Sequence, residues 1–297
     1  MRRLPETVQV LYAELLDQLR AAEHELHVPV GGSFVSKTIG SGRYWYLQRT
    51  EKGRRTQTYL GPETPELLQQ IEAAREQRVD LKWRRQLVSM LTAGGAASES
   101  ATFTAVMQVL AESFVFRLGG VLVGTQAFMC YANMLGVRFA AESLRTADID
   151  VAEHAKVSVV VARDGSLDLL ERLRMVEPRF LLPHLNVAAQ PLEGLDYLIE
   201  TTTTAAVVGG SGILVNVPLP ARYAVHKLWV AKTRPVSDQT KARKDYAQAR
   251  QLMEVLLADR AGDIEEAVAA IRRRPGMWKR IQKDIAHLTE GGSRQSE

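Results

Sequence analysis

The chain changes from strand to helix within Leu122-Val123-Gly124-Thr125-Gln126-Ala127-Phe128, where a glycine turn separates two apolar runs. Glycine permits the backbone angles that such a turn requires. The first N–H groups of the following helix then lack intrahelical partners, and such a helix start suits the phosphates of a triphosphate. An ordinary strand-to-helix turn explains the same glycine without any ligand. The run predicts an α/β unit and leaves both interpretations of the turn open.

A pair of aspartates follows in Ala147-Asp148-Ile149-Asp150-Val151, which has the composition of a short strand. Side chains at positions i and i+2 of a strand point to the same face, so Asp148 and Asp150 are expected side by side. Adjacent carboxylates repel one another unless a proton or a cation lies between them. Mg²⁺ (or Mn²⁺), bound together with substrate phosphates, meets that need. The alternative is a solvated strand end with two unrelated acids, and the glycine turn upstream favours the metal site.

The two motifs together resemble the nucleotidyltransferase fold, in which a glycine turn precedes two acids separated by one residue. The chain also resembles one bacterial family of that fold, which is distantly similar to the nucleotidyltransferase toxins of abortive-infection systems. The resemblance covers about residues 100–290, and these runs carry it: Leu122 to Phe128, Leu135 to Arg138, Arg145 to Ala152, Ala189 to Leu192, Asp196 to Ile199, Leu214 to Pro218, Ala224 to Leu228 and Lys241 to Asp245.

The resemblance implies an enzyme that transfers a nucleoside monophosphate from an NTP to a hydroxyl of an acceptor, either RNA or protein. It implies that Asp148 and Asp150 are catalytic metal ligands. It also implies a set of nucleotide-binding residues: Gly124, Thr125, Arg145, Lys227 and Lys244. For Lys227 the alternative is a solvated helix lysine, and for Lys244 with Asp245 it is a surface charge pair of little energetic value.

Active members of this superfamily usually carry a third carboxylate on a strand after the acidic pair. Asp168 is the candidate for that catalytic position, although Ser166-Leu167-Asp168-Leu169-Leu170 has the pattern of a helix. The interval between Asp150 and Ala189 is short for the family. If the third acid is missing, the resemblance implies a different function, that of a catalytically degenerate nucleic-acid-binding protein that retains the fold.

Residues 31–60 contain a second signal, three short strands expected at 33–37, 44–47 and 56–60. This segment holds six basic residues and one acidic residue, with aromatic residues between them. Basic groups neutralise phosphates and aromatic rings stack on bases, so one interpretation is nucleic-acid binding. The other is a small sheet whose aromatic residues pack on the next helix while its charges are solvated. The candidate contacts are Lys37, Arg43, Trp45, Arg54 and Arg55.

Hydrophobic periodicity and turn residues divide the chain into three parts. Residues 1–98 are predicted to form a helix, the basic β meander and a long helix, ending in a Gly/Ala/Ser linker at 92–98. Residues 99–219 are predicted to form a nucleotidyltransferase-like core with a mixed sheet. Residues 220–290 are expected to be helical. The expected fold class is therefore α/β (α+β), with C-terminal helices and a small N-terminal three-stranded β module.

The composition excludes several classes of protein. The 297 residues are 46% hydrophobic and 24% charged, with a net charge of +4, which is typical of a globular chain and not of a disordered one. A single cysteine, Cys130, excludes an intramolecular disulfide and a cysteine-rich zinc site, and it fits a cytoplasmic protein. The uncharged runs 118–137 and 201–221 are interrupted by glycine, asparagine, threonine or proline, so we expect no contact with a membrane.

Overall fold

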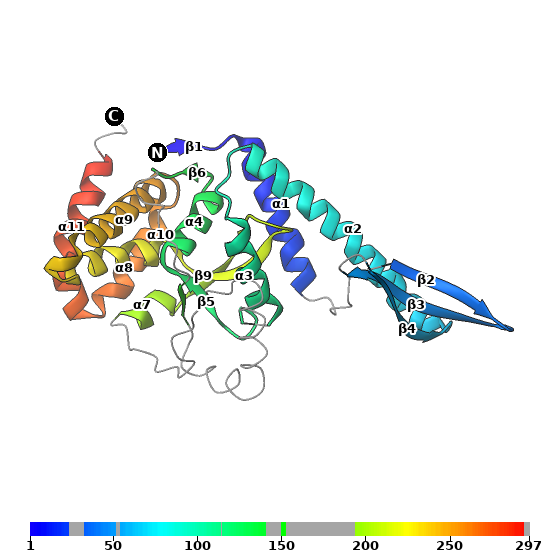
Figure 1. Cartoon of the computed structure of the whole chain (residues 1–297). Helices are drawn as coiled ribbons and strands as arrows, with labels where there is room; N and C mark the ends of the chain where they lie inside the picture. Colours follow the sequence, from blue (N-terminus) through cyan, green and yellow to red (C-terminus); the bar gives the residue numbers. More distant parts are fainter. Residues whose placement is uncertain (24–32, 52–53, 114, 141–149, 153–193, 294–297) are drawn as a thin grey trace.

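The structure is a computed structural model, which describes the backbone of residues 1–23, 33–51, 54–113, 115–140, 150–152 and 194–293. Within these residues the chain forms a mixed α/β core, a layer of C-terminal helices and a three-stranded sheet at the end of a long helix (Figure 1). This arrangement confirms the predicted fold class.

The core contains a four-stranded sheet in the order β7-β5-β9-β8. Its strands are β5 (Val121–Val123), β7 (Asp150–Ala152), β8 (Thr202–Val207) and β9 (Ile213–Pro218). The last two form the antiparallel hairpin that the glycine-rich run 209–212 predicts. Strand β5 is antiparallel to β7 and parallel to β9, so the sheet is mixed, as expected. The side-chain amide of Asn216 on β9 donates to the carbonyls of Phe116 and Gly120 and thereby fixes the loop that leads into β5.

Helices cover this sheet and supply most of the core. They are α3 (Ala101–Glu112), α4 (Gly124–Met134), α7 (Leu195–Ile199), α8 (Pro220–Thr233), α9 (Gln239–Asp259), α10 (Ala261–Arg272) and α11 (Pro275–Ser293), with a 3-10 turn at η2 (Val236–Asp238). Pro220 occupies the first turn of α8, where its missing N–H leaves no hydrogen bond unmade. Phe128, Tyr131, Tyr197 and Tyr223 are among the largest side chains that are fully buried. The C-terminal helices thus lie where the sequence predicts them.

The N-terminal helix α1 (Glu6–Glu23) packs against β8, the edge strand of the core sheet. The N–H of Ala206 on that strand donates to the hydroxyl of buried Tyr12 at 3.0 Å. A helix that covers an edge in this way prevents further strand pairing there. Strand β1 (Arg2–Arg3) pairs with β6 (Val137–Arg138), and Arg3 makes two hydrogen bonds to Asp259 at the end of α9. The division at residue 98 stays a prediction, and α1 lies against the core rather than apart from it.

The predicted linker at 92–98 is held in place. It follows helix α2 (Pro65–Ala93), which begins with Thr64 as a side-chain cap. The amide of Asn133 on α4 bonds both the N–H and the carbonyl of Ala97 at 2.8 Å, and Arg138 donates to the carbonyl of Gly95. The glycines of the linker allow close packing, because a Cβ at Gly94 would collide with Val8 on α1 and one at Gly95 with Arg138 on β6.

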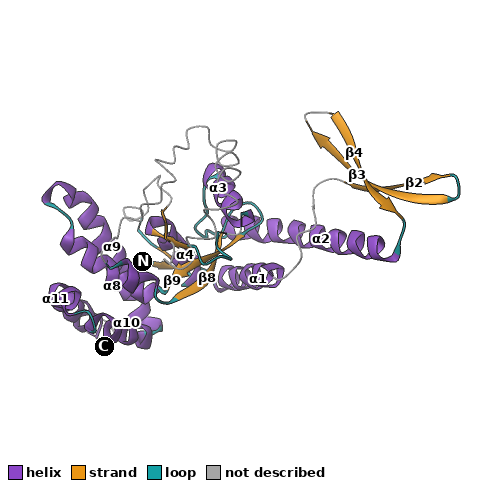
Figure 2. Ribbon diagram, turned by 90° about the horizontal axis from the view of Figure 1, so that it is seen from below, coloured by secondary structure: helices purple, strands orange, loops and turns teal. Residues whose placement is uncertain are grey.

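The basic meander forms a sheet of its own, with β2 (Ser33–Ile39), β3 (Gly42–Glu51) and β4 (Arg54–Pro62) in that order. All three predicted strands are confirmed and are longer than expected. Figure 2 shows this sheet at the far end of α2, away from the four-stranded core sheet. Trp45 and Leu47 on one face are buried, as are Ile71 and Ala74 on α2.

Some expectations fall outside the described residues, among them the strand expected at 157–161 and the helix expected to begin at Ser166. Among the described helices, none is both long enough and apolar enough to cross a membrane.

Candidate functional site

The glycine turn lies where the sequence predicts it, between β5 and α4. Gly124 has a φ of 66°, a conformation that other L-residues rarely adopt, and it opens the helix. Val123 at the N-cap position makes no side-chain cap hydrogen bond, and the first turn holds no acidic residue. The first N–H groups of α4 are therefore donors that the helix itself does not satisfy.

Asp150 lies in β7 and pairs with Val123, the residue directly before the glycine turn. The backbone thus brings one member of the acidic pair next to the start of α4. Asp148, Arg145 and Asp168 lie outside the described residues. The direction of the carboxylates stays a prediction from the alternation of strand side chains.

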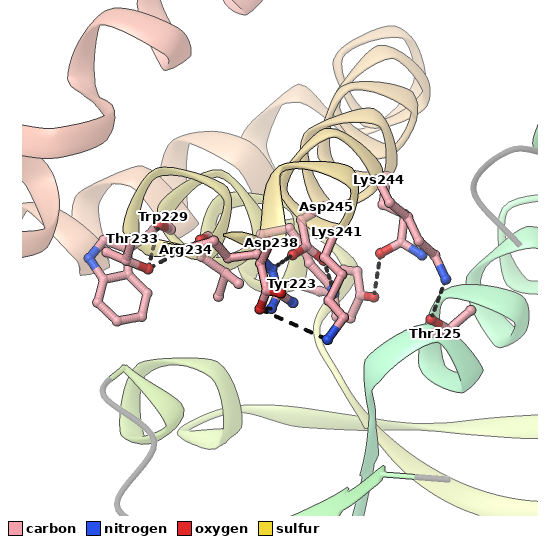
Figure 3. Close-up of polar contacts among 12 residues, drawn as sticks. Thr125, Tyr223, Trp229, Thr233, Arg234, Asp238, Lys241, Lys244 and Asp245 are labelled. Carbon is pink, nitrogen blue, oxygen red and sulfur yellow. Dashed lines mark hydrogen bonds and ion pairs between the residues drawn. The ribbon is translucent and has the colours of Figure 1, made fainter. Parts of the chain in front are cut away.

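Two helices from the C-terminal part reach the same turn (Figure 3). Lys244 on α9 donates from Nζ to the hydroxyl of Thr125 at 3.2 Å, and Thr125 is buried. Tyr223 on α8 donates to the carbonyl of Gly124 at 2.8 Å, and its hydroxyl also lies 3.2 Å from Oε1 of Gln248 on α9. These contacts join the turn to the α8–α9 pair. Lys244 is therefore close to the turn, as the resemblance implies.

Lys227 has a different environment from the one that a phosphate contact needs. Its ammonium group lies 2.6 Å from Oδ1 of Asp245, and the two side chains are only 12% and 4% exposed. Arg234 occupies the other carboxylate oxygen of Asp245, at 2.5 Å from Nε. The solvated-lysine alternative is wrong for Lys227, because the residue is a buried partner of an ion pair. Asp245 is likewise buried and does not belong to a surface charge pair.

The charge balance of this cluster is positive. Lys227 and Arg234 share the carboxylate of Asp245, and Arg234 also lies 3.9 Å from Asp238. Lys244 lies at the N-terminus of α4, so three cations face two carboxylates. A helix N-terminus carries partial positive charge, which repels a cation and attracts an anion. The start of α4 and Lys244 would therefore both stabilise a bound anion. Burial, reinforced by the neighbouring Lys227 cation, lowers the pKa of His226 to about 3. His226 is therefore neutral near pH 7 and adds no charge of its own.

The acidic pair has the donor chemistry that a divalent cation requires, and the structure describes only the backbone of Asp150 from that pair. No group of three or more metal-ligating side chains occurs in the part of the chain that the structure describes. The acidic pair supplies the hard oxygen donors that Mg²⁺ and Mn²⁺ prefer, and the register places Asp150 beside a helix start that suits the phosphates.

The candidate nucleic-acid contacts on the meander separate into two groups. Trp45 is buried, its indole N–H donates to Glu63 at 2.9 Å, and the guanidinium of Arg75 on α2 lies 5.9 Å from its ring centre. Trp45 thus packs on α2 and offers no ring to a base. Arg43 pairs with Glu63 at the rim of that contact. Lys37 and Arg55 are exposed, and nothing is described of the side chain of Arg54.

The sequence analysis missed three polar residues of the cluster: Tyr223, Arg234 and Gln248. Tyr223 lies in the segment expected to be helical, and its hydroxyl donates to the carbonyl of Gly124, which is 99 positions away in the sequence. Arg234 lies 11 positions from Asp245, beyond the reach of helical spacing. Only the folded arrangement of α8 and α9 brings these groups together.

Comparison with known families agrees with this geometry. Residues 101–182 and 177–272 match the family described as Nucleotidyltransferase, and residues 3–70 match a family described as a domain of unknown function (DUF6788). No curated protein and no solved structure matches the chain. The first match runs from α3 to the end of α10 and contains the glycine turn, Asp150 and Lys244. Because this match spans more than half of the 297 residues, the chain belongs to that nucleotidyltransferase family.

Proposed function

We propose that this chain is a metal-dependent nucleotidyltransferase that moves a nucleoside monophosphate from an NTP to a hydroxyl group of RNA or protein. One observation carries the proposal: Lys244 is bonded to Thr125 at the glycine turn, and the strand beside that turn contains Asp150. A phosphate-binding helix start, a cation and an acidic strand meet within one part of the core. This is the combination that transfer from a triphosphate needs.

The residues of the chain have separate roles in this proposal. The N–H groups at the start of α4, with Gly124 and Thr125, bind phosphate oxygens, and Lys244 neutralises part of their charge. Arg145 belongs to the same nucleotide-binding set. Asp148 and Asp150 hold Mg²⁺ or Mn²⁺, which when bound supplies charge stabilisation to the attacking and leaving oxygens.

The reaction forms a bond between the acceptor oxygen and the α-phosphorus and breaks the bond to pyrophosphate. The proton of the acceptor hydroxyl passes to a carboxylate, and Asp168 is the candidate for that base.

Lys227 acts as a positioning residue in this proposal. Its buried pair with Asp245 fixes α8 against α9, and α9 carries Lys244 one position before Asp245. The Lys-Leu element at 227–228 and the Lys-Asp element at 244–245 thus meet in space. These are the elements that the chain shares with abortive-infection nucleotidyltransferase toxins. A distant kinship with those toxins and a bacterial, cytoplasmic setting are part of the same proposal, and they rest on the sequence resemblance and the single cysteine.

The deciding experiment is transfer of label from each α-labelled NTP, with and without Mg²⁺, to RNA or to protein. Asp150→Asn keeps size and shape but removes a charge, and we expect label transfer to fall on the order of 10²-fold or more. The melting temperature without metal should stay the same or rise, because the change relieves repulsion with Asp148. The matched control is Glu265→Gln, an exposed carboxylate on α10, which should transfer label normally.

The same assay separates the two functions that the sequence left open. An equal loss in Asp168→Asn places that residue in the site. A wild-type chain that neither transfers label nor binds Mg·NTP in calorimetry overturns the proposal in favour of a nucleic-acid-binding protein that retains the fold.

A further inference from the structure

The outward face of the β2-β3-β4 sheet carries aromatic, amide and cationic groups together. Residues directly opposite each other on paired strands share a face, and the register pairs Lys37 with Tyr44, Tyr46 with Tyr59, and Gln48 with Gln57. We call this set the tyrosine face: Lys37, Tyr44, Tyr46, Gln48, Gln57 and Tyr59. The opposite face contains Trp45 and Leu47, which are buried.

The rings of the tyrosine face lie close together and are accessible. The ring centres of Tyr46 and Tyr59 are 5.4 Å apart, and those of Tyr44 and Tyr59 are 6.3 Å apart. Tyr59 is 54% exposed, which is unusual for a large aromatic side chain that has a sheet to pack on. Tyr44 and Tyr46 are half-buried beside it. An exposed ring with two partly exposed neighbours on a sheet is a surface on which unstacked bases can stack.

Charge and hydrogen-bonding groups surround these rings. The ammonium group of Lys37 lies 4.8 Å from the ring centre of Tyr46 and donates to Oε1 of Gln57 at 2.5 Å. The amide of Gln57 in turn donates to Gln48. Register places Arg55 opposite Thr50, on the same side as the tyrosines. Lys37 and Arg55 are thus cations on this face, and Arg43 lies on the opposite one and pairs with Glu63. With these cations the face suits a polyanion and not a basic partner.

From this juxtaposition we infer that the tyrosine face is a binding surface for single-stranded nucleic acid. The bases stack on Tyr44, Tyr46 and Tyr59, and Lys37 and Arg55 neutralise phosphates. The amides of Gln48 and Gln57 are in position to bond base edges. These contacts differ from the candidate contacts that the sequence suggested, because Trp45 is buried on the other face and the tyrosines and glutamines lie on this one.

The inference goes beyond the proposed function and does not depend on it. The sheet lies at the far end of α2 from the glycine turn, so binding there requires neither NTP nor metal (Figure 2). Failure of nucleotide transfer and failure of strand binding are therefore separate results.

The test is fluorescence anisotropy with the full-length chain, without NTP and without divalent metal. The probes are labelled uridine and thymidine homopolymers of about 15 nucleotides, near the upper end of the site sizes that small domains cover. A duplex of the same length and inorganic polyphosphate serve as probes without accessible base faces. We expect both single strands, or one of them, to bind more tightly than the duplex and the polyphosphate.

Two variants of Tyr59 test the stacking. Tyr59→Ala should weaken binding of the homopolymer on the order of 5- to 100-fold, the range for the loss of one stacked base, and should leave polyphosphate binding unchanged. Tyr59→Phe keeps the ring and should bind like wild type. The chain has four tryptophans, so the fluorescence of Trp45 is read in a background with Phe at the other three, and its unchanged value shows that the sheet is folded. The matched control is Trp83→Ala, a ring 40% exposed on α2, which should have no effect.

The salt dependence tests the cations. Lys37→Gln should reduce the slope of log K against log salt by about 0.7, the value for one phosphate contact on a single strand. Lys82→Gln on α2 should leave the slope unchanged. The inference is overturned if Tyr59→Ala binds as tightly as wild type, if the duplex or the polyphosphate binds as tightly as the single strands, or if none of the probes binds.

Discussion

Lys244 and Thr125 are 119 positions apart in the sequence, and a hydrogen bond of 3.2 Å joins Nζ of the lysine to the hydroxyl of the threonine. The bond connects the C-terminal helices to the first turn of α4. It therefore makes the position of a cation at the glycine turn depend on how α9 packs against the core.

Removal of the lysine charge should weaken nucleotide binding. We expect Lys244→Gln to raise the dissociation constant of Mg·NTP by about 10- to 100-fold, because hydrogen bonds to charged groups contribute about 1.5–3 kcal/mol. Isothermal calorimetry measures the effect. Lys241→Gln is the matched control, since that side chain is 67% exposed and lies 3.9 Å from Asp238. Equal binding by Lys244→Gln and wild type would exclude the lysine from the nucleotide site.

The buried ion pairs of Asp245 should contribute far more to stability than the more exposed contact between Asp238 and Arg234. Asp245→Asn leaves Lys227 and Arg234 without their shared carboxylate, and we expect a loss of about 3–5 kcal/mol in the free energy of unfolding. Asp238 is 35% exposed and 3.9 Å from Arg234, so Asp238→Asn should change stability by about 0.5 kcal/mol or less. Urea unfolding measures both. Similar losses in the two variants would show that burial of the pair contributes nothing.

Glu99 should make the stability depend on pH. Burial raises its pKa from 4.5 to about 7, so the folded chain holds a proton that the unfolded chain releases. This contribution is fully present below pH 4.5 and is lost as the pH rises through about 7. Glu99→Gln removes the ionisation. The melting temperature of the variant minus that of wild type should therefore rise between pH 4.5 and pH 8, and a constant or falling difference would contradict the prediction. Glu254→Gln, an exposed control on α9, should follow wild type at every pH.

Tyr12 tests whether α1 belongs to the core. Tyr12→Phe removes the acceptor of the Ala206 N–H, and a buried donor without a partner costs about 1–3 kcal/mol. Tyr59→Phe, an exposed tyrosine, should cost about 0.5 kcal/mol or less. Chemical unfolding of the two variants gives the comparison. If Tyr12→Phe lost no more free energy of unfolding than Tyr59→Phe, the hydroxyl of Tyr12 would be dispensable and other contacts would hold α1 against the core.

The local features of the fold could be predicted from the sequence. The apolar run at β5 and the glycine after it define a strand and a helix start, because both signals lie within a few residues. The hairpin of β8 and β9 follows from apolar runs that flank a glycine turn. Of the acidic motif, only Asp150 lies among the described residues, and it opens β7, within one residue of the end of the strand expected at 147–151.

The long-range contacts could not be predicted in the same way. Nothing in the spacing of Lys227 and Asp245 shows that one neutralises the other, since they lie on different helices. The small residues of 94–97 are equally compatible with a free linker and with close packing, and only Asn133 decides between them. Trp45 is a different case, because Leu47 two positions later already marks an apolar face of the strand.

Helix α2 sets the distance between the β2-β3-β4 sheet and the core. Its 29 residues rise about 44 Å. A continuous helix, and not a flexible linker, therefore separates the tyrosine face from the part of the core that holds the glycine turn. If the two proposals hold together, a nucleic-acid strand bound on the tyrosine face reaches the glycine turn only when it is long enough, and strand length then limits which acceptors react. Removal of seven residues from the middle of α2 would shorten the helix by about 10 Å and turn the β2-β3-β4 sheet by only about 20°. The shortest nucleic-acid strand that can react should then become shorter by the same distance.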